Sequence, residues 1–173
     1  RAGDGHRIVP ARIREGANLQ HPPREGLHPR GTEVSVVLDL MIHDLEIILH
    51  LVKAPLREFH AVGVPVLSPS EDIANVRLVF EGGCVANVSA SRISMERVRK
   101  IRVFQPDAYL SLDYQAQTGI MHRKTATGIA TEPIPIEKGE PLLNELRSFV
   151  ECVRTHNEPV VSGVQASQAL QLA

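Results

Sequence analysis

Between residues 58 and 124 the sequence is a succession of strand-length segments in which apolar and polar side chains alternate. The even-numbered residues of ANVRLVF (74–80) and of CVANVSASR (84–92) are mainly small or apolar, and the turn EGG lies between the two segments. This pattern predicts a β-hairpin. Further strands are expected at 58–66, 100–105, 108–114 and 118–124. Short strands joined by short turns predict an antiparallel meander of about six strands.

Helical patterns flank these strands. Residues 36–52 have the length of a helix, are apolar on most of its circumference and are soon followed by Pro55, so we expect a buried helix. Residues 141–157 have apolar side chains at helical spacing, and a last helix begins after a cap at Ser162. The order helix, strands, helix predicts an α+β fold with an open, mainly antiparallel sheet and helices packed on one face.

Residues 1–30 differ from the rest of the chain because they are rich in Pro, Gly and His and have no sustained periodicity. We expect an irregular segment with at most one strand near Arg12–Leu19, followed by a single α+β domain over 31–173. The histidines of this segment do not have metal-ligand spacing, which favours a solvated tail over a metal site. The chain begins without Met and stops inside a helical pattern, so we expect it to be part of a longer protein.

Charge and cysteine content exclude several classes of protein. Lys and Arg number 19 and Asp and Glu 20, whereas a dedicated nucleic-acid binder normally has a basic excess. No apolar run reaches the ~18 residues that a membrane span requires. Cys84 and Cys152 are the only cysteines. They cannot form a four-cysteine zinc site and are expected to be reduced thiols in a cytoplasmic protein.

Asp39 and His43 are the leading candidates for catalysis. Their spacing of four places both on one face of the predicted helix, one turn apart. A carboxylate beside an imidazole orients the ring and raises its pKa, which suits acid–base chemistry near neutral pH. The alternative is a buried Asp–His hydrogen bond without a catalytic role. Asp44 and Glu46 are expected to point away from this face, as capping, solvated or sheet-contacting groups.

Other chemistries have less support in the sequence. A metal site formed by Asp39, His43 and His50 is conceivable, but an HExxH helix and a close fourth ligand are missing. No GxSxG elbow is present, and neither cysteine has an adjacent base. The sequence also contains neither GxxxxGK[ST] nor GxGxxG, so it has no phosphate-binding loop of either type.

A group of basic residues follows the second strand of the hairpin. Arg92 is the first of them, and the others are Arg97, Arg99, Lys100 and Arg102. Arginines at strand ends can bind a phosphate or a carboxylate of a ligand, and we expect Arg92 to contact substrate. The alternative is a polar outer face on an amphipathic sheet.

Two segments resemble a known family, the Gfo/Idh/MocA-type NAD(P)-dependent sugar dehydrogenases. VVLDLMIHDLEIILHLV (36–52) resembles the helix that opens their C-terminal domain, with its D-x-x-x-H-D-(I/L)-(D/E) pattern. EPLLNELRSFVECVRTHNEPVVSGVQASQAL (140–170) is similar to their closing segment. The stretch 72–117 resembles the branch that includes UDP-N-acetylglucosamine 3-dehydrogenases.

This resemblance implies that the chain is the C-terminal half of a two-domain enzyme. NAD or NADP would be bound mainly by an N-terminal Rossmann domain outside this chain. The present domain would bind a sugar or nucleotide sugar and form homo-oligomers through its sheet. His43 would act as the acid–base, with Asp39 orienting it, together with a lysine from an E-K-P motif of the N-terminal domain.

The sequence departs from the family pattern in two respects. The E-K-P lysine is missing, because the one EK pair, Glu137–Lys138, is followed by Gly139. The segment before residue 30 matches the expected G-H-x-x-R-F-x-P-A stretch only at Gly5–His6 and Pro10–Ala11. We therefore expect this chain alone to lack dehydrogenase activity. A non-catalytic oligomerisation or binding module and, less favoured, a metal-dependent hydrolase remain as alternatives.

Overall fold

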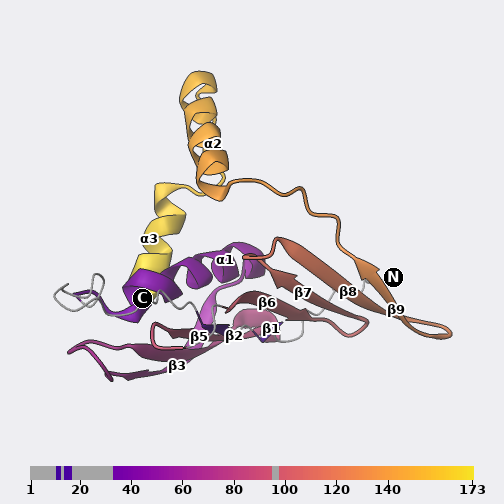
Figure 1. Ribbon diagram of the computed structural model, residues 1–173, viewed down its shortest axis with the longest axis horizontal. Helices are drawn as coiled ribbons and strands as arrows, with labels where there is room; N and C mark the ends of the chain where they lie inside the picture. The colour runs from indigo at the N-terminus through magenta and orange to yellow at the C-terminus, as the bar shows by residue number, and fades with distance from the viewer. Residues whose placement is uncertain (1–10, 13, 17–32, 95–97) are drawn as a thin grey trace, which may run out of the picture.

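The computed structural model describes residues 11–12, 14–16, 33–94 and 98–173. A long helix lies on one face of a β-layer, a second helix rests on it, and a third projects from the body (Figure 1). The predicted α+β architecture with helices on one side of open antiparallel sheets is confirmed.

The strands form two hydrogen-bonded sheets. The first has the order β1-β5-β4-β3 and the second the order β2-β6-β7-β8-β9. The strands of the first sheet are β1 (Ala11–Arg12), β3 (Leu56–Val64), β4 (Ile73–Phe80) and β5 (Val85–Ser91). Those of the second are β2 (Arg14–Gly16), β6 (Val98–Phe104), β7 (Ala108–Asp113), β8 (Thr118–Thr125) and β9 (Gly128–Pro133).

The meander is interrupted between β5 and β6, which are consecutive among the long strands but do not pair. The short strands β1 and β2 join the sheets instead, because β1 pairs in parallel with β5 and β2 pairs antiparallel with β6. A strand near Arg12–Leu19 is thus found at Arg14–Gly16. The sequence did not predict β9, whose Pro133 is tolerated because this strand lies at the sheet edge.

The core lies between one face of the β4–β5 hairpin and the long helix. The predicted alternation is confirmed, since the even-numbered side chains of β4 and β5 point inward and are buried. Gly82 and Gly83 form the connecting turn with positive φ angles of 80° and 87°, a conformation that glycine adopts without strain. The buried cluster comprises Val36, Leu40, Met41, Leu45, Ile48, Ala74, Val76, Leu78, Phe80, Cys84, Ala86, Val88, Ala90 and Ile101.

The long helix begins with a π-helical turn, η1 (Val37–Met41), and continues as α1 (Ile42–Val52). Only one face of it is buried. Leu38 and Leu51 are 45% and 54% exposed. The expectation of a helix buried on most of its circumference is therefore wrong, because the described chain covers only part of its outer side.

The two remaining helices differ in their surroundings. Helix α3 (Gly163–Leu172) packs on α1 and begins with the predicted Ser162 cap, whose hydroxyl accepts a hydrogen bond from the N–H of Gln165. Helix α2 (Pro141–Thr155) has no buried residue. Among the described residues, no helix is both long and apolar enough to cross a bilayer.

Candidate functional site

Asp39 and His43 lie one turn apart near the start of the long helix, as the spacing predicts. Asp39 is half-buried within η1, and His43 is exposed as the second residue of α1. The core-facing Leu45 and Ile48 lie roughly half a turn around the helix from His43. The two candidate residues therefore face away from the core, where a ligand can reach them.

The buried Asp–His hydrogen bond considered as the structural alternative is not formed. The interactions of the described residues include none between these two side chains, and His43 is exposed. Catalytic contacts are often long in a free enzyme and tighten when the substrate binds. The arrangement leaves the imidazole available for a proton transfer.

Asp39 is the central residue of the π-helical turn. The N–H of Ile42 donates to the carbonyl of Val37, five residues earlier. Such turns are rare, occur mostly as single insertions in α-helices and are frequent at functional sites. A π-helical turn has more residues per turn than an α-helical one, so each residue rotates the chain less about the helix axis. The side chains of Asp39 and His43 therefore point in more similar directions than they would in a regular α-helix.

The polar face of the helix extends beyond Asp39 and His43. Asp39, His43, Glu46 and His50 have the spacing i, i+4, i+7 and i+11, which places them in one row. We call this row the α1 polar stripe. The expectation that Glu46 points away from this face is wrong, because Glu46 lies three residues after His43 within α1 and therefore on the same side of the helix. Glu46 also lines a pocket together with His50. The i+3 spacing from His43 was the signal that could have identified it.

That pocket lies between α1 and α3. It has a volume of about 50 Å³, enough for a few water molecules. Its lining residues are Glu46, Leu49, His50, Val161, Gln165 and Gln168. The α1 polar stripe thus runs from Asp39 past the exposed His43 to this small pocket.

Asp44 lies on the opposite side of the helix from the stripe. It is only 4% exposed, on the side that packs against the sheet. Of the three roles expected for it, a solvated position is excluded by this burial.

Arg92 is held by the protein itself. It follows β5, and its Nε lies 3.5 Å from Oδ1 of the fully buried Asp72, which precedes β4. Its Nη2 also donates to the carbonyl of Val34, just before the long helix. The guanidinium therefore connects the open end of the β4–β5 hairpin to the start of the helix that carries Asp39 and His43.

The carboxylate of Asp72 is surrounded by hydrogen-bond donors. The backbone N–H groups of residues 66–68 all donate to Oδ2 at 2.6–2.9 Å, and the Ser68 hydroxyl donates to Oδ1 at 2.9 Å. Burial alone would raise the pKa of Asp72, but these hydrogen bonds outweigh it and hold the pKa well below its usual value. Asp72 remains charged and can pair with Arg92.

Those of the other basic residues that the structure describes, Arg99, Lys100 and Arg102, lie on β6 of the second sheet. Lys100 Nζ lies 3.5 Å from Asp113 Oδ2, on neighbouring strands of the second sheet. Arg99 is exposed and Arg102 is half-buried on β6, while Arg97 lies outside the described residues. The predicted cluster is thus spread along a strand.

Thiol and metal chemistry receive no geometric support in the described part of the chain. Cys84 and Cys152 are free, and burial raises the pKa of the Cys84 thiol, which disfavours a nucleophilic thiolate. The described residues contain no group of three or more His, Cys, Asp or Glu side chains arranged to hold a metal ion.

Comparison with known proteins identifies the relatives of this fold. The family model for the GFO/IDH/MocA C-terminal domain matches residues 7–110. UDP-N-acetylglucosamine 3-dehydrogenase from Acidithiobacillus ferrooxidans is 33% identical over 151 residues, which are 84% of this chain and 48% of the relative. The match to the family begins within residues 1–30, which retain little of the expected family pattern.

Solved structures agree with this relationship. A structure of the same A. ferrooxidans enzyme superposes with a TM-score of 0.81 at 28% identity, covering 96% of this chain and 52% of that one. Levoglucosan dehydrogenase in complex with NADH has a TM-score of 0.79 at 14% identity, with coverages of 94% and 54%. The chain spans about half the length of the relatives it matches.

Proposed function

This chain belongs to the GFO/IDH/MocA C-terminal domain family, and from that membership we propose that it is the substrate-binding and catalytic half of an NAD(P)-dependent sugar or nucleotide-sugar dehydrogenase. The similarity to UDP-N-acetylglucosamine 3-dehydrogenase makes a UDP-linked amino sugar the first substrate to test. A cytoplasmic location is part of the same proposal.

One observation supports this function above the others. The two residues suited to proton transfer lie one turn apart on the side of the long helix away from the core, and Asp39 occupies a π-helical turn. Packing alone does not require a π-helical turn at a carboxylate that faces away from the core, whereas such turns are frequent at functional sites.

The proposed chemistry is oxidation of a sugar CH–OH group. NAD(P), held mainly by the half of the enzyme outside this chain, supplies the hydride acceptor. His43 takes the hydroxyl proton as the carbonyl forms, and Asp39 orients the imidazole and stabilises its protonated form. Glu46 and His50 continue the stripe toward the α1–α3 pocket and offer the proton a route to water.

The exposed residues of this chain fit such a division of labour. The sequence contains neither GxxxxGK[ST] nor GxGxxG, whereas His43 and His50 of the α1 polar stripe are exposed. A substrate contact by Arg92 stays a prediction; the two internal contacts of its guanidinium support a positioning role.

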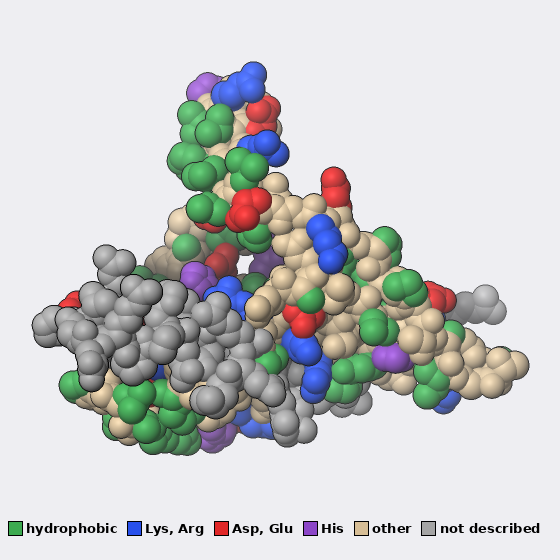
Figure 2. Space-filling model, in the orientation of Figure 1, with side chains coloured by type: hydrophobic (Ala, Val, Ile, Leu, Met, Phe, Trp, Pro, Cys, Tyr) green, Lys and Arg blue, Asp and Glu red, His purple; other side chains and the backbone are tan. Residues whose placement is uncertain are grey.

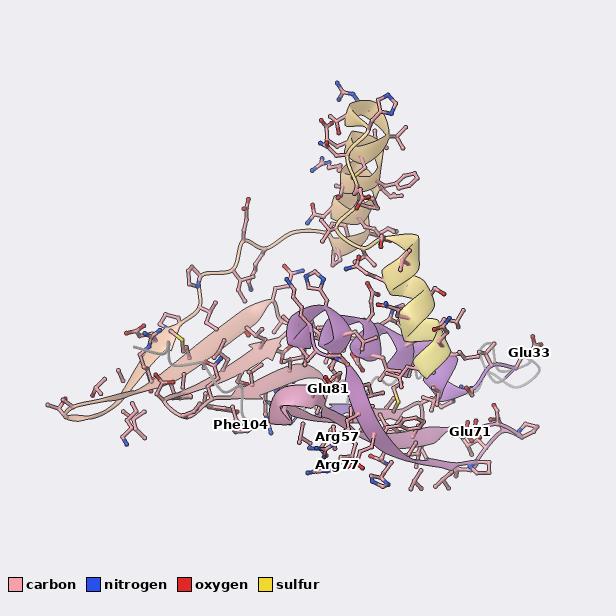
Figure 3. The ribbon with its side chains drawn as sticks, turned by 180° about the vertical axis from the view of Figure 1, so that it is seen from behind. Glu33, Arg57, Glu71, Arg77, Glu81 and Phe104 are labelled. Carbon is pink, nitrogen blue, oxygen red and sulfur yellow. The ribbon has the colours of Figure 1, made fainter. Side chains whose placement is uncertain are left out.

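The face of the sheets away from α1 supports a homo-oligomer as part of this proposal. Arg77 donates to Asn87 at 3.0 Å across β4 and β5, and Arg77 is exposed while Asn87 is half-buried. Figure 3 shows Arg57, Arg77 and Phe104 on the side away from the long helix. Such an ordered open sheet face is suited to pairing with a second copy. Arg77→Glu should lower the mass measured by size-exclusion chromatography with light scattering, whereas a monomeric wild type would exclude this contact.

The decisive experiment measures NAD(P)H formation by the full-length protein with UDP-N-acetylglucosamine and other nucleotide sugars. We expect activity in the wild type and its loss in His43→Ala. His156→Asn is the matched control, because His156 is an exposed histidine at the C-terminal cap of α2, and asparagine tolerates the left-handed backbone of that position. Equal turnover in His43→Ala and wild type would exclude the assigned role. Absence of activity with every sugar and both cofactors would favour the non-catalytic module instead.

A further inference from the structure

The pocket between α1 and α3 combines apolar walls with hydrogen-bonding groups. Figure 2 shows acidic and histidine side chains gathered below the base of α2. The apolar lining residues are Leu49 and Val161, and the polar ones are Glu46, His50, Gln165 and Gln168. Proton transfer alone does not require the two amides or the apolar walls. This composition is that of a ligand subsite, in which a few polar groups orient the ligand and apolar groups contact it.

The side-chain amide of Gln165 has a fixed orientation. It belongs to the capping box at the start of α3, where its Oε1 accepts a hydrogen bond from the N–H of Ser162 at 2.8 Å. In return, the backbone N–H of Gln165 donates to the Ser162 hydroxyl at 3.3 Å. Because the carbonyl oxygen is directed at Ser162, the Nε2 group is the part of this side chain left to donate to a ligand.

The pocket lies within two helical turns of His43 along the α1 polar stripe. With a rise of about 1.5 Å per residue, Glu46 is about 4.5 Å and His50 about 10.5 Å beyond His43 along the helix axis. Both of these residues line the pocket. A substituent on the carbon next to the reacting one can therefore reach the pocket while His43 contacts the reacting hydroxyl.

The first substrate to test carries a substituent of matching chemistry. The A. ferrooxidans relative is a UDP-N-acetylglucosamine 3-dehydrogenase, so its reacting carbon is next to the carbon that bears the acetamido group. The methyl carbon of that group lies about 3.8 Å from the ring carbon, across a planar amide. An acetamido group presents one N–H donor, one carbonyl acceptor and one methyl group, and the pocket offers a partner for each.

We propose that the α1–α3 pocket is the subsite for the acetamido group of a nucleotide-linked N-acetylamino sugar. Nε2 of Gln165 donates to the acetamido carbonyl, and the carboxylate of Glu46 accepts from the acetamido N–H. The methyl group contacts Leu49 and Val161, while the exposed His50 stays open to water. A volume of about 50 Å³ admits such a substituent and excludes a whole sugar ring. This inference rests on the proposed function and specifies its substrate class.

The test compares kcat/KM of the full-length protein for UDP-N-acetylglucosamine and for UDP-glucose, which has a hydroxyl in place of the acetamido group. Gln165→Glu is the informative variant, because the carboxylate still accepts the Ser162 N–H and preserves the capping box but has no N–H to donate. Gln171→Glu makes the same charge change at an exposed position of α3 and is the matched control.

We expect the wild type to prefer UDP-N-acetylglucosamine. Gln165→Glu should lower kcat/KM for this sugar by roughly 10- to 100-fold and that for UDP-glucose by less than about threefold, because only the first presents an acetamido carbonyl. Gln171→Glu should retain the preference of the wild type. A wild type without this preference, or a preference that Gln165→Glu leaves unchanged, would overturn the proposal.

A second measurement needs neither a variant nor turnover. In saturation-transfer NMR of the wild type with UDP-N-acetylglucosamine, the acetamido methyl protons should receive more saturation than the anomeric proton of the sugar, because Leu49 and Val161 enclose them. Methyl protons that receive no more saturation than the anomeric proton would contradict the subsite, even if the sugar is oxidised. Strongly saturated methyl protons without oxidation of any sugar would show that the proposed function fails and the subsite stands.

Discussion

Asp72 and Arg92 form an ion pair across the open end of the β4–β5 hairpin, with Oδ1 and Nε 3.5 Å apart and the Asp72 side chain fully buried. The pair lies beneath the start of the long helix, where the N–H of Val36 donates to the carbonyl of Glu71 at 2.8 Å. The position of Asp39 and His43 therefore depends on contacts that are far from them in sequence.

The first prediction concerns Asp72 and the acid stability of the fold. The folded-state pKa of Asp72 lies below its usual value, so its stabilising contribution is fully present above about pH 4 and is lost progressively as the pH falls. Asp72→Asn should lower the free energy of unfolding at pH 7 by about 3 kcal/mol and should flatten the decline below pH 4. Urea unfolding between pH 2 and 7 measures both effects. An unchanged acid slope would show that Asp72 does not cause it.

The second prediction concerns Arg92 as an anchor of the helix. Removing one partner of a buried pair leaves the other charge uncompensated, so Arg92→Ala should destabilise the protein by about 3 kcal/mol. It should also free the Val34 carbonyl and speed amide hydrogen exchange in η1. Arg92→Lys keeps the charge but loses the planar fork, so its effect should be intermediate.

The control for this experiment is Arg77→Ala, which removes an exposed arginine on the opposite face of the sheet. Similar exchange in η1 for Arg92→Ala and Arg77→Ala would contradict the anchoring role. A selective rise in KM with unchanged exchange would favour the substrate contact instead.

The third prediction concerns Asp39. Because the proposed mechanism has this carboxylate orient His43, Asp39→Asn should reduce kcat of the full-length protein by a factor of about 100. Asp107→Asn, in an exposed turn, is the matched control. A kcat equal to that of the wild type would remove Asp39 from the proposed mechanism.

The fourth prediction tests the core assignment. Leu78 is completely buried, whereas Leu51 is 54% exposed on the long helix. Leu78→Ala should lower the free energy of unfolding by roughly 2–5 kcal/mol, and Leu51→Ala by less than about 1 kcal/mol. Chemical denaturation of the two variants measures the contrast. Equal losses would show that the side of the helix carrying Leu51 is also covered in the natural protein.

Local pattern was enough to predict most of the elements. Alternation identified the hairpin and the inward side chains of β4, such as Leu78, because the side-chain period of a strand is two. A spacing of four was enough to place Asp39 and His43 on one helix face. Resemblance to the family was also visible in sequence segments, and the match over residues 7–110 confirms it.

Long-range contacts explain what the sequence alone did not predict. The split of the meander depends on β1 and β2, which pair with strands more than 70 positions away in the chain. Arg92 looked like a ligand-binding residue because its partners, Asp72 and the Val34 carbonyl, are brought to it only by folding. The spacing of Glu46 was enough to predict that it lies on the same helix face as His43. Its pocket could not be predicted, because the pocket forms only where α3 packs on α1.

The sequence by itself therefore determined the elements, their inward faces and the catalytic candidates, since each depends on neighbours within a few residues. Only the tertiary structure determined which polar side chains are paired within the protein and which are exposed to solvent. Burial and pairing depend on what the chain brings together in space: Arg92 is engaged, His43 is exposed and the apolar face of α2 is left uncovered.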